Sequence, residues 1–91
     1  MMCLVVSKYG AFYVCESLKR EGNTINCTNA WMITKNKANK FYHRCCFKGR
    51  GVNNVIEESI FTRESSHEEI YTFLKKNGLV RSTLMNRVEG I

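Results

Sequence analysis

The sequence predicts an α+β fold, in which an antiparallel sheet of four to five strands is packed by one or two C-terminal helices. The apolar residues up to about Lys48 alternate and are rich in β-type side chains, whereas those beyond Ser65 follow helical spacing. A chain of 91 residues suffices for one modest core, so residues 1–91 are expected to form a single domain. The hydrophobic fraction of 44% and the charged fraction of 24% are ordinary for a folded protein.

The first three strands are expected within residues 3–34. Residues 3–7 form a short strand that ends at a turn of Tyr9 and Gly10, and residues 11–19 form a second one. Glu21-Gly22-Asn23 lies between two β-like runs and predicts a three-residue hairpin turn, after which residues 24–34 form the third strand. Alternation places Phe12, Val14 and Leu18 on one face of the second strand and Tyr13 and Cys15 on the other. In the third strand the residues that share a face are Ile25, Cys27, Trp31 and Ile33.

The fourth strand, residues 40–48, follows a polar turn at 35–39 and precedes a flexible loop, Gly49-Arg50-Gly51. Successive side chains of a strand point to opposite faces, so this segment separates into two sets. The set expected to face the core is Phe41, His43, Cys45 and Phe47. The set expected to face solvent is Lys40, Tyr42, Arg44, Cys46 and Lys48.

The last third of the chain is expected to be mainly helical. Residues 52–62 fit either a strand or a helix, and we expect a short fifth strand near 59–63. Ser65 or Ser66 can cap a helix with Glu68 or Glu69 as the capping-box partner, and Gly78 suits its end. The expected buried stripe is Ile70, Phe73 and Leu74, with His67 as a solvated surface residue. A final short helix is expected at 82–88.

The charge is segregated along the chain. Lysine and arginine total 14, acidic residues total 8, all of them glutamate, and the net charge is +6. No acidic residue lies between Glu21 and Glu57, and the residues outside this stretch carry eight basic and eight acidic groups. The whole excess therefore lies in the middle, where a local positive field attracts phosphates or an acidic protein surface.

Nucleic-acid binding is the function that this pattern favours most. Basic side chains neutralise phosphates, and an aromatic side chain between them can stack on an unpaired base. The predicted binding residues are Lys35, Lys37, Lys40, Tyr42, Arg44, Lys48 and Arg50. No standard recognition motif accompanies them, and the alternative is a solvated basic face that protects an edge strand from aggregation.

A zinc- or thiol-dependent small enzyme using His43 and Cys45 is the alternative in another functional class. The potential ligands are Cys15, Cys27, His43, Cys45 and Cys46, but none of them forms the CxxC pair of a compact zinc site. Thiol catalysis would also need an orienting carboxylate, and the glutamates cluster elsewhere. No nucleotide-binding glycine motif is present. We therefore expect no enzyme and no cofactor.

The expected protein is a small basic binding protein that acts by occupancy. Its target is nucleic acid, or a host protein or ribonucleoprotein that handles nucleic acid, in the manner of an inhibitor or takeover factor. The absence of proline and the scarcity of alanine suit an AT-rich coding sequence of a phage, virus or mobile element. An exposed strand edge would permit a homodimer. No run approaches the roughly 20 apolar residues that cross a bilayer, so we expect a cytoplasmic protein without a membrane partner.

Overall fold

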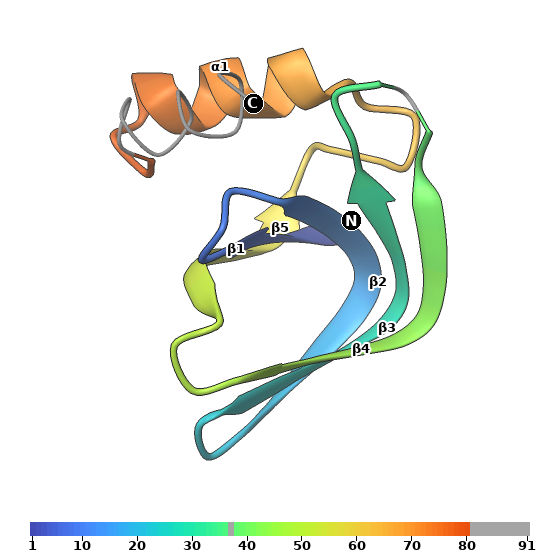
Figure 1. Cartoon of the computed structure of the whole chain (residues 1–91), viewed down its shortest axis with the longest axis vertical. Helices are drawn as coiled ribbons and strands as arrows, with labels where there is room; N and C mark the ends of the chain where they lie inside the picture. The colour runs from blue at the N-terminus through green and yellow to red at the C-terminus, as the bar shows by residue number, and fades with distance from the viewer. Residues whose placement is uncertain (37, 81–91) are drawn as a thin grey trace.

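Five antiparallel strands and one helix make up the described part of the chain (Figure 1). The structure is a computed structural model, and it describes residues 1–36 and 38–80. The elements are β1 (Met2–Ser7), β2 (Phe12–Glu21), β3 (Thr24–Ile33), β4 (Lys40–Lys48), β5 (Val52–Ser59) and α1 (His67–Lys76). The strand order is β4-β3-β2-β1-β5. The α+β fold with a five-stranded sheet and a helix after it is thus confirmed, and the helix expected at 82–88 lies outside the described residues.

The sheet is strongly curled (Figure 1). β2, β3 and β4 bend midway, so that their far halves turn beneath β1 and β5, and α1 lies above β1 and β2 on the other side. The apolar side chains accordingly form two clusters, one under α1 and one inside the curl. Both faces of β1 are therefore covered, and Cys3 to Ser7 form a continuous buried run.

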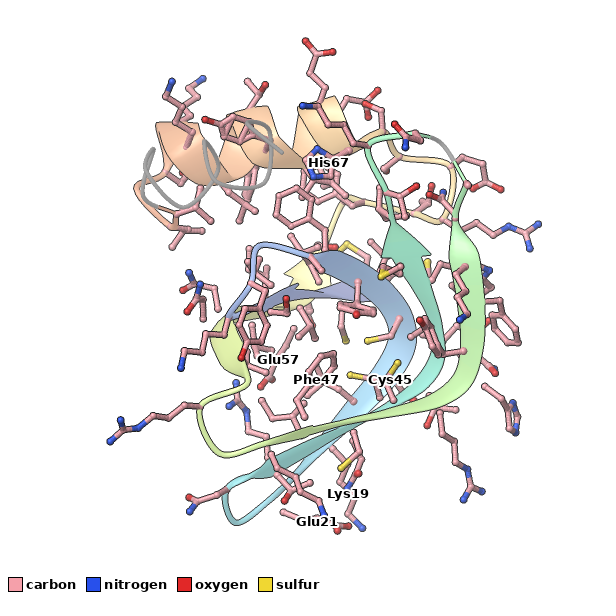
Figure 2. All side chains as sticks on the ribbon, in the orientation of Figure 1. Lys19, Glu21, Cys45, Phe47, Glu57 and His67 are labelled. Atoms are coloured by element: carbon pink, nitrogen blue, oxygen red, sulfur yellow. The ribbon has the colours of Figure 1, made fainter. Side chains whose placement is uncertain are left out.

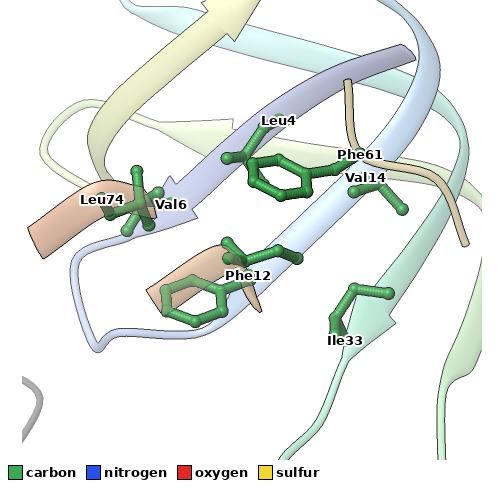
Figure 3. Close-up of a cluster of buried hydrophobic side chains, with 8 residues drawn as sticks. Leu4, Val6, Phe12, Val14, Ile33, Phe61 and Leu74 are labelled. Atoms are coloured by element: carbon green, nitrogen blue, oxygen red, sulfur yellow. The ribbon is translucent and has the colours of Figure 1, made fainter. Parts of the chain in front are cut away.

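The first cluster joins α1 to the sheet (Figure 3). Leu4 lies opposite Val14, and Val6 lies opposite Phe12, on the neighbouring strands β1 and β2. The buried members are Leu4, Val6, Phe12, Val14, Ile33, Phe61, Ile70 and Leu74. Burial of Ile70 and Leu74, with Phe73 half-buried beside them, confirms the stripe expected for the helix.

The ends of α1 follow from its sequence. The Ser66 hydroxyl accepts a hydrogen bond from the Glu69 backbone N–H at 3.1 Å, which makes Ser66 the N-cap. At the other end Gly78 has a φ of +66°, and its N–H bonds to the Lys75 carbonyl at 3.1 Å. The Leu79 N–H bonds to the Leu74 carbonyl at 2.8 Å. The two bonds form a Schellman motif, which satisfies carbonyls that the last helical turn leaves open.

The side chain of His67, the first residue of α1, lies between the helix and the sheet and not on the surface, contrary to the expectation. Only 8% of the residue is exposed, and its ring stacks on Phe12 with centroids 4.5 Å apart. The first turn of α1 lies directly over β2, so a side chain at the helix start points into the sheet (Figure 2). The helical stripe therefore begins at 67, one turn before the first apolar residue of α1, Ile70.

The second cluster, inside the curl, is rich in thiols. Cys3 lies opposite Cys15 on β1 and β2, and Cys27 lies opposite Cys45 on β3 and β4. The fully buried members are Cys3, Val5, Cys15, Cys27 and Ala30, and all five cysteines of the chain are free thiols. Cysteine here acts as a small hydrophobic residue that fits where strands close on one another.

The fifth strand is earlier in the chain than expected. Val52–Ser59 pairs with β1, and the Ser59 hydroxyl donates to the Met2 carbonyl at 3.0 Å. Residues 60–63 instead leave the sheet, which exposes Ile60 and delivers Phe61 to the cluster under α1. The turn between β2 and β3 is also shorter than expected, with Gly22 at a φ of +59° in a two-residue connection.

Candidate functional site

The order of exposed and buried residues along β4 departs from simple alternation. Tyr42, Cys45 and Phe47 pack against the cluster inside the curl, and Figure 2 shows Cys45 and Phe47 pointing into it. The exposed residues that follow Phe41 are His43, Arg44, Cys46 and Lys48. The faces predicted for residues 44–48 and for Lys40 are thus confirmed, whereas those of Phe41, Tyr42 and His43 are wrong, because two consecutive residues, His43 and Arg44, both point outward. We call the surface formed by Phe41, His43, Arg44, Cys46 and Lys48 the outer face of β4.

The bend of the sheet explains this departure. At the bend Asn29 adopts a φ of +49°, a left-handed conformation that asparagine tolerates better than most residues. Its amide nitrogen donates to the Glu16 carboxylate at 2.8 Å, and its carbonyl oxygen lies 3.1 Å from Nδ1 of His43. Three neighbouring strands therefore contribute one polar residue each to a single hydrogen-bonded row. The alternation of all three strands changes across this row.

The same change corrects the faces predicted for β2 and β3 on one side of the bend only: the face shared by Phe12 and Val14 is confirmed, whereas Leu18 does not belong to it. Leu18 packs with Tyr13 inside the curl and not with Phe12 under α1. In β3, Ile25 lies inside the curl, whereas Trp31 packs against the other cluster. Both strands remain in register through the bend, so the pairing itself gives no sign of the change.

The basic residues of the predicted site carry charge that the described residues do not neutralise. Lys35, Lys40, Arg44, Lys48 and Arg50 are exposed. None of them forms an ion pair with another described residue. The ion pairs found join Lys19 to Glu21, Arg20 to Glu57 and Arg63 to Glu64. Lys37 lies outside the described residues.

Tyr42 does not share a face with Arg44. The tyrosine is half-buried, its ring centroid lies 6.1 Å from that of Tyr13, and Lys40 Nζ lies 5.3 Å from its centroid. Lys40 and Tyr42 therefore pair at the rim of the curl, before the bend, whereas Arg44 projects from the outer face. The predicted solvent face on which Tyr42 lies between Lys40 and Arg44 is therefore not formed.

Phe41 is the aromatic residue that the outer face presents. Half of the residue is exposed, at 50%, and its ring centroid lies 5.1 Å from that of Trp31, its cross-strand partner on β3. The Arg63 guanidinium lies 5.8 Å from the centroid of the Trp31 ring. Sequence reasoning missed these three residues, because strict alternation placed Phe41 and Trp31 in the core and no pattern linked Arg63 to them.

His43 and Cys45 lie on opposite sides of β4, so the pair needed for a zinc or thiol site is not assembled. Within residues 1–36 and 38–80, no cluster of three or more histidine, cysteine or glutamate side chains is arranged to hold a metal ion. Burial and the neighbouring Cys27 raise the pKa of the Cys45 thiol to about 11. A hydrogen bond to Cys27, with burial, also raises the pKa of Cys15 far above its ordinary value. Such thiols stay protonated near neutral pH and are poor nucleophiles.

A cleft of about 870 Å³ separates the end of β3 from the start of α1. Its charged lining is mixed, with Lys35 and Arg63 facing Glu64 and Glu68. Because the Arg63–Glu64 pair is closed at 2.8 Å, this cleft has less free positive charge than the outer face of β4. The outer face is therefore the stronger candidate for binding an anion.

Comparison with known proteins gives no match: no family model and no curated protein sequence is similar to this chain. Among the described residues, no helix has the length and apolar character needed to cross a bilayer.

Proposed function

We propose that this protein is a non-enzymatic nucleic-acid-binding protein that acts by occupancy, through the outer face of β4 and the two loops beside it. The observation that carries the proposal is the group of exposed cations that form no ion pair within the described part of the chain, Lys35, Lys40, Arg44, Lys48 and Arg50. Exposed cations on one strand and its two flanking loops attract a phosphate backbone and release its counterions on binding.

The acidic groups strengthen this proposal by where they lie. Glu21, Glu57 and Glu64 are engaged by basic residues of β2 and of the loop before α1. Glu68 and Glu69 occupy the first turn of α1, on the layer opposite the curl. β4 itself has no acidic residue. A phosphate chain that follows β4 thus meets no acidic residue of the strand itself, and the carboxylate nearest to the bend, Glu16 of β2, is hydrogen-bonded to Asn29.

Self-association through the β4 edge is disfavoured by the same charges. An antiparallel pair of β4 strands centred on Arg44 would place Lys40 opposite Lys48 and Arg44 opposite itself, and like charges directly opposite are destabilising. The unpaired edge of β4 is therefore protected from a second copy. A homodimer through a strand edge, if formed, would use β5, the other edge strand of the described sheet.

The proposal is tested by fluorescence anisotropy with labelled single-stranded and duplex RNA and DNA across a salt series. The variant is the triple substitution Lys40→Gln, Arg44→Gln, Lys48→Gln. A matched pair of double variants accompanies it: Arg44→Gln, Lys48→Gln on β4, and Lys75→Gln, Lys76→Gln, which removes the same charge from exposed positions at the end of α1, away from β4 and its loops. We expect binding that weakens steeply with salt, and a slope of log K against log salt that falls by about two to three in the triple variant and not in the double variant of α1.

Equal loss of binding in the two double variants would mean that only net charge matters, and would contradict a site on β4. No binding of any nucleic acid at low salt by the folded protein would refute the proposal. That outcome would point to an acidic protein surface, such as that of a host factor that handles nucleic acid. Recovery of a defined partner by the wild type and not by the β4 variant would then identify it.

A further inference from the structure

We infer that the ligand of the outer face of β4 is single-stranded nucleic acid, and that Phe41 stacks on one of its bases. This inference rests on the proposed nucleic-acid function and deepens it by naming the form of the ligand and the residue that selects it. Its basis is the arrangement of one half-exposed aromatic ring, Phe41, and two cations, Arg44 and Lys48, that form no ion pair with another described residue, on one surface.

Phe41 is presented on a supported platform. Its ring packs on Trp31 at 5.1 Å with an interplanar angle of 45°, and Trp31 is packed in turn against the cluster under α1. Arg63 lies near the Trp31 ring from the loop before α1. Phe41 nevertheless leaves 50% of its surface in solvent, although α1 covers other apolar residues of the same sheet. A ring that is held in place and half open is suited to stacking, because little side-chain freedom is lost when a base covers it.

Two cations follow Phe41 along the outer face, on the other side of the bend. Arg44 and Lys48 project from the same face, and Lys40 stands beside Phe41 at the start of the strand. At the rise of an extended strand the path along β4 from Phe41 to Lys48 is about 23 Å, and the bend makes the direct distance shorter. This reach suits a short segment of an extended strand, since single-strand-binding folds cover about 4 nucleotides or more. The phosphates would follow Arg44 and Lys48 while one base lies on Phe41.

A duplex fits this surface less well. Its base faces are covered by neighbouring pairs, so Phe41 could not stack without disrupting it. Reading a duplex groove requires a projecting helix or two-stranded ribbon. The outer face of β4 is instead the flank of a curled sheet, and the helix of the described chain, α1, lies on another side of the molecule with glutamates in its first turn (Figure 1).

The bend is the reason that stacking and charge occur together. With simple alternation, Phe41 and Arg44 would lie on opposite faces of β4. The outward step at His43 and Arg44 puts both on one surface, and the hydrogen-bonded row of Glu16, Asn29 and His43 spans the strands there. The hydrogen bonds of this row thus stabilise the bend that places Phe41 and Arg44 on one surface.

The test compares Phe41→Leu with Phe41→Trp. Leucine keeps an apolar contact with Trp31 and removes the flat ring, whereas tryptophan keeps a stacking surface. The probes are a labelled 12-nucleotide single strand, as RNA and as DNA, the duplex of the same length, and an abasic strand with the same phosphates. Urea unfolding of each variant shows that it is folded. The RNA and DNA arms decide which sugar is preferred.

We expect Phe41→Leu to weaken single-strand binding about 5- to 150-fold, the range measured for loss of one stacked base. Phe41→Trp should retain the affinity, and the abasic strand should bind wild type as weakly as the normal strand binds Phe41→Leu. The salt dependence of Phe41→Leu should equal that of wild type, because no cation is removed. Unchanged affinity of Phe41→Leu, or a duplex bound as tightly as the single strand, would overturn the inference while salt-dependent binding leaves the proposed function standing. Absence of all binding would overturn both.

Discussion

Because Asn29 has a positive φ, we predict that glycine is more stable than valine at this strand position, which is the reverse of the usual order. At an ordinary exposed strand position valine is more stable than glycine by roughly 1 kcal/mol, because β-branched residues suit a pleated surface. At position 29, with a φ of +49°, the order should reverse. The variants Asn29→Val and Asn29→Gly both lose the amide hydrogen bonds to Glu16 and His43, so this loss cancels in their comparison.

The expected difference follows from two opposing terms. Valine at a left-handed φ is strained by about 1–3 kcal/mol. Glycine has no such strain but gives the unfolded chain an extra entropy equivalent to about 0.4–1 kcal/mol. Asn29→Gly should therefore be the more stable variant, by about 1 kcal/mol at the middle of these two ranges. Thr28, the exposed neighbour without a positive φ, provides the control, and there Thr28→Val should be more stable than Thr28→Gly.

Urea unfolding followed by the fluorescence of Trp31, the single tryptophan, measures both pairs. With a denaturant slope of about 1–3 kcal/mol per molar, the midpoints of the two position-29 variants should differ by about 0.3–1 M, in the order opposite to that at position 28. If Asn29→Val were the more stable of its pair, the left-handed backbone would not be what position 29 requires. The explanation of the bend would then be wrong. Asn29→Val should also bind single strands more weakly than Asn29→Gly, because the outer face depends on the bend.

The remaining predictions concern the helix and the thiols. Ser66→Ala should lower the free energy of unfolding by about 1 kcal/mol, because the hydrogen bond to the Glu69 N–H is lost. Leu74→Ala should lower it by about 2–5 kcal/mol, because the Leu74 side chain is buried. Thermal unfolding that leaves either variant like wild type would contradict the helix placement. Cys46, the exposed thiol, should react with a disulfide reagent at pH 8 well before the other cysteines, and Cys46→Ser should remove the fast phase; a fast phase that persists would contradict its placement. Because the folded pKa of Cys45 is about 11 against 9.0 for a free thiol, its contribution to stability is fully present below pH 9 and is lost as pH rises through 11. The free energy of unfolding, measured with urea, should accordingly fall between pH 9 and 11, by up to about 1.4 kcal/mol per pH unit for each such thiol. The fall should be smaller in Cys45→Ala. A free energy of unfolding that does not change over this pH range would contradict the burial of the thiol.

Much of the local structure was determined by the sequence itself. β4 begins and ends at Lys40 and Lys48, as expected, because polar turn residues and glycines flank its β-type run. The serine cap, the apolar stripe and Gly78 defined α1 for the same reason: each acts within a turn or two of itself. The concentration of charge between Glu21 and Glu57 was likewise evident from the sequence, since a count of charges needs no geometry.

Only the tertiary structure decided which side chains share a surface. Period-two alternation assumes a regular strand, and the bend at Asn29 shifts it in three strands at once while their register is kept. No local sequence pattern identifies residue 29 as the site of the bend. The left-handed conformation of Asn29 is instead favoured by the curl of the sheet, which encloses the second cluster. The prediction that His67 is a surface residue was wrong for a related reason, since its burial depends on the way α1 lies over Phe12. The charge of the candidate site is thus a property of the sequence, whereas the curled sheet decides that Phe41, Arg44 and Lys48 lie on the same surface.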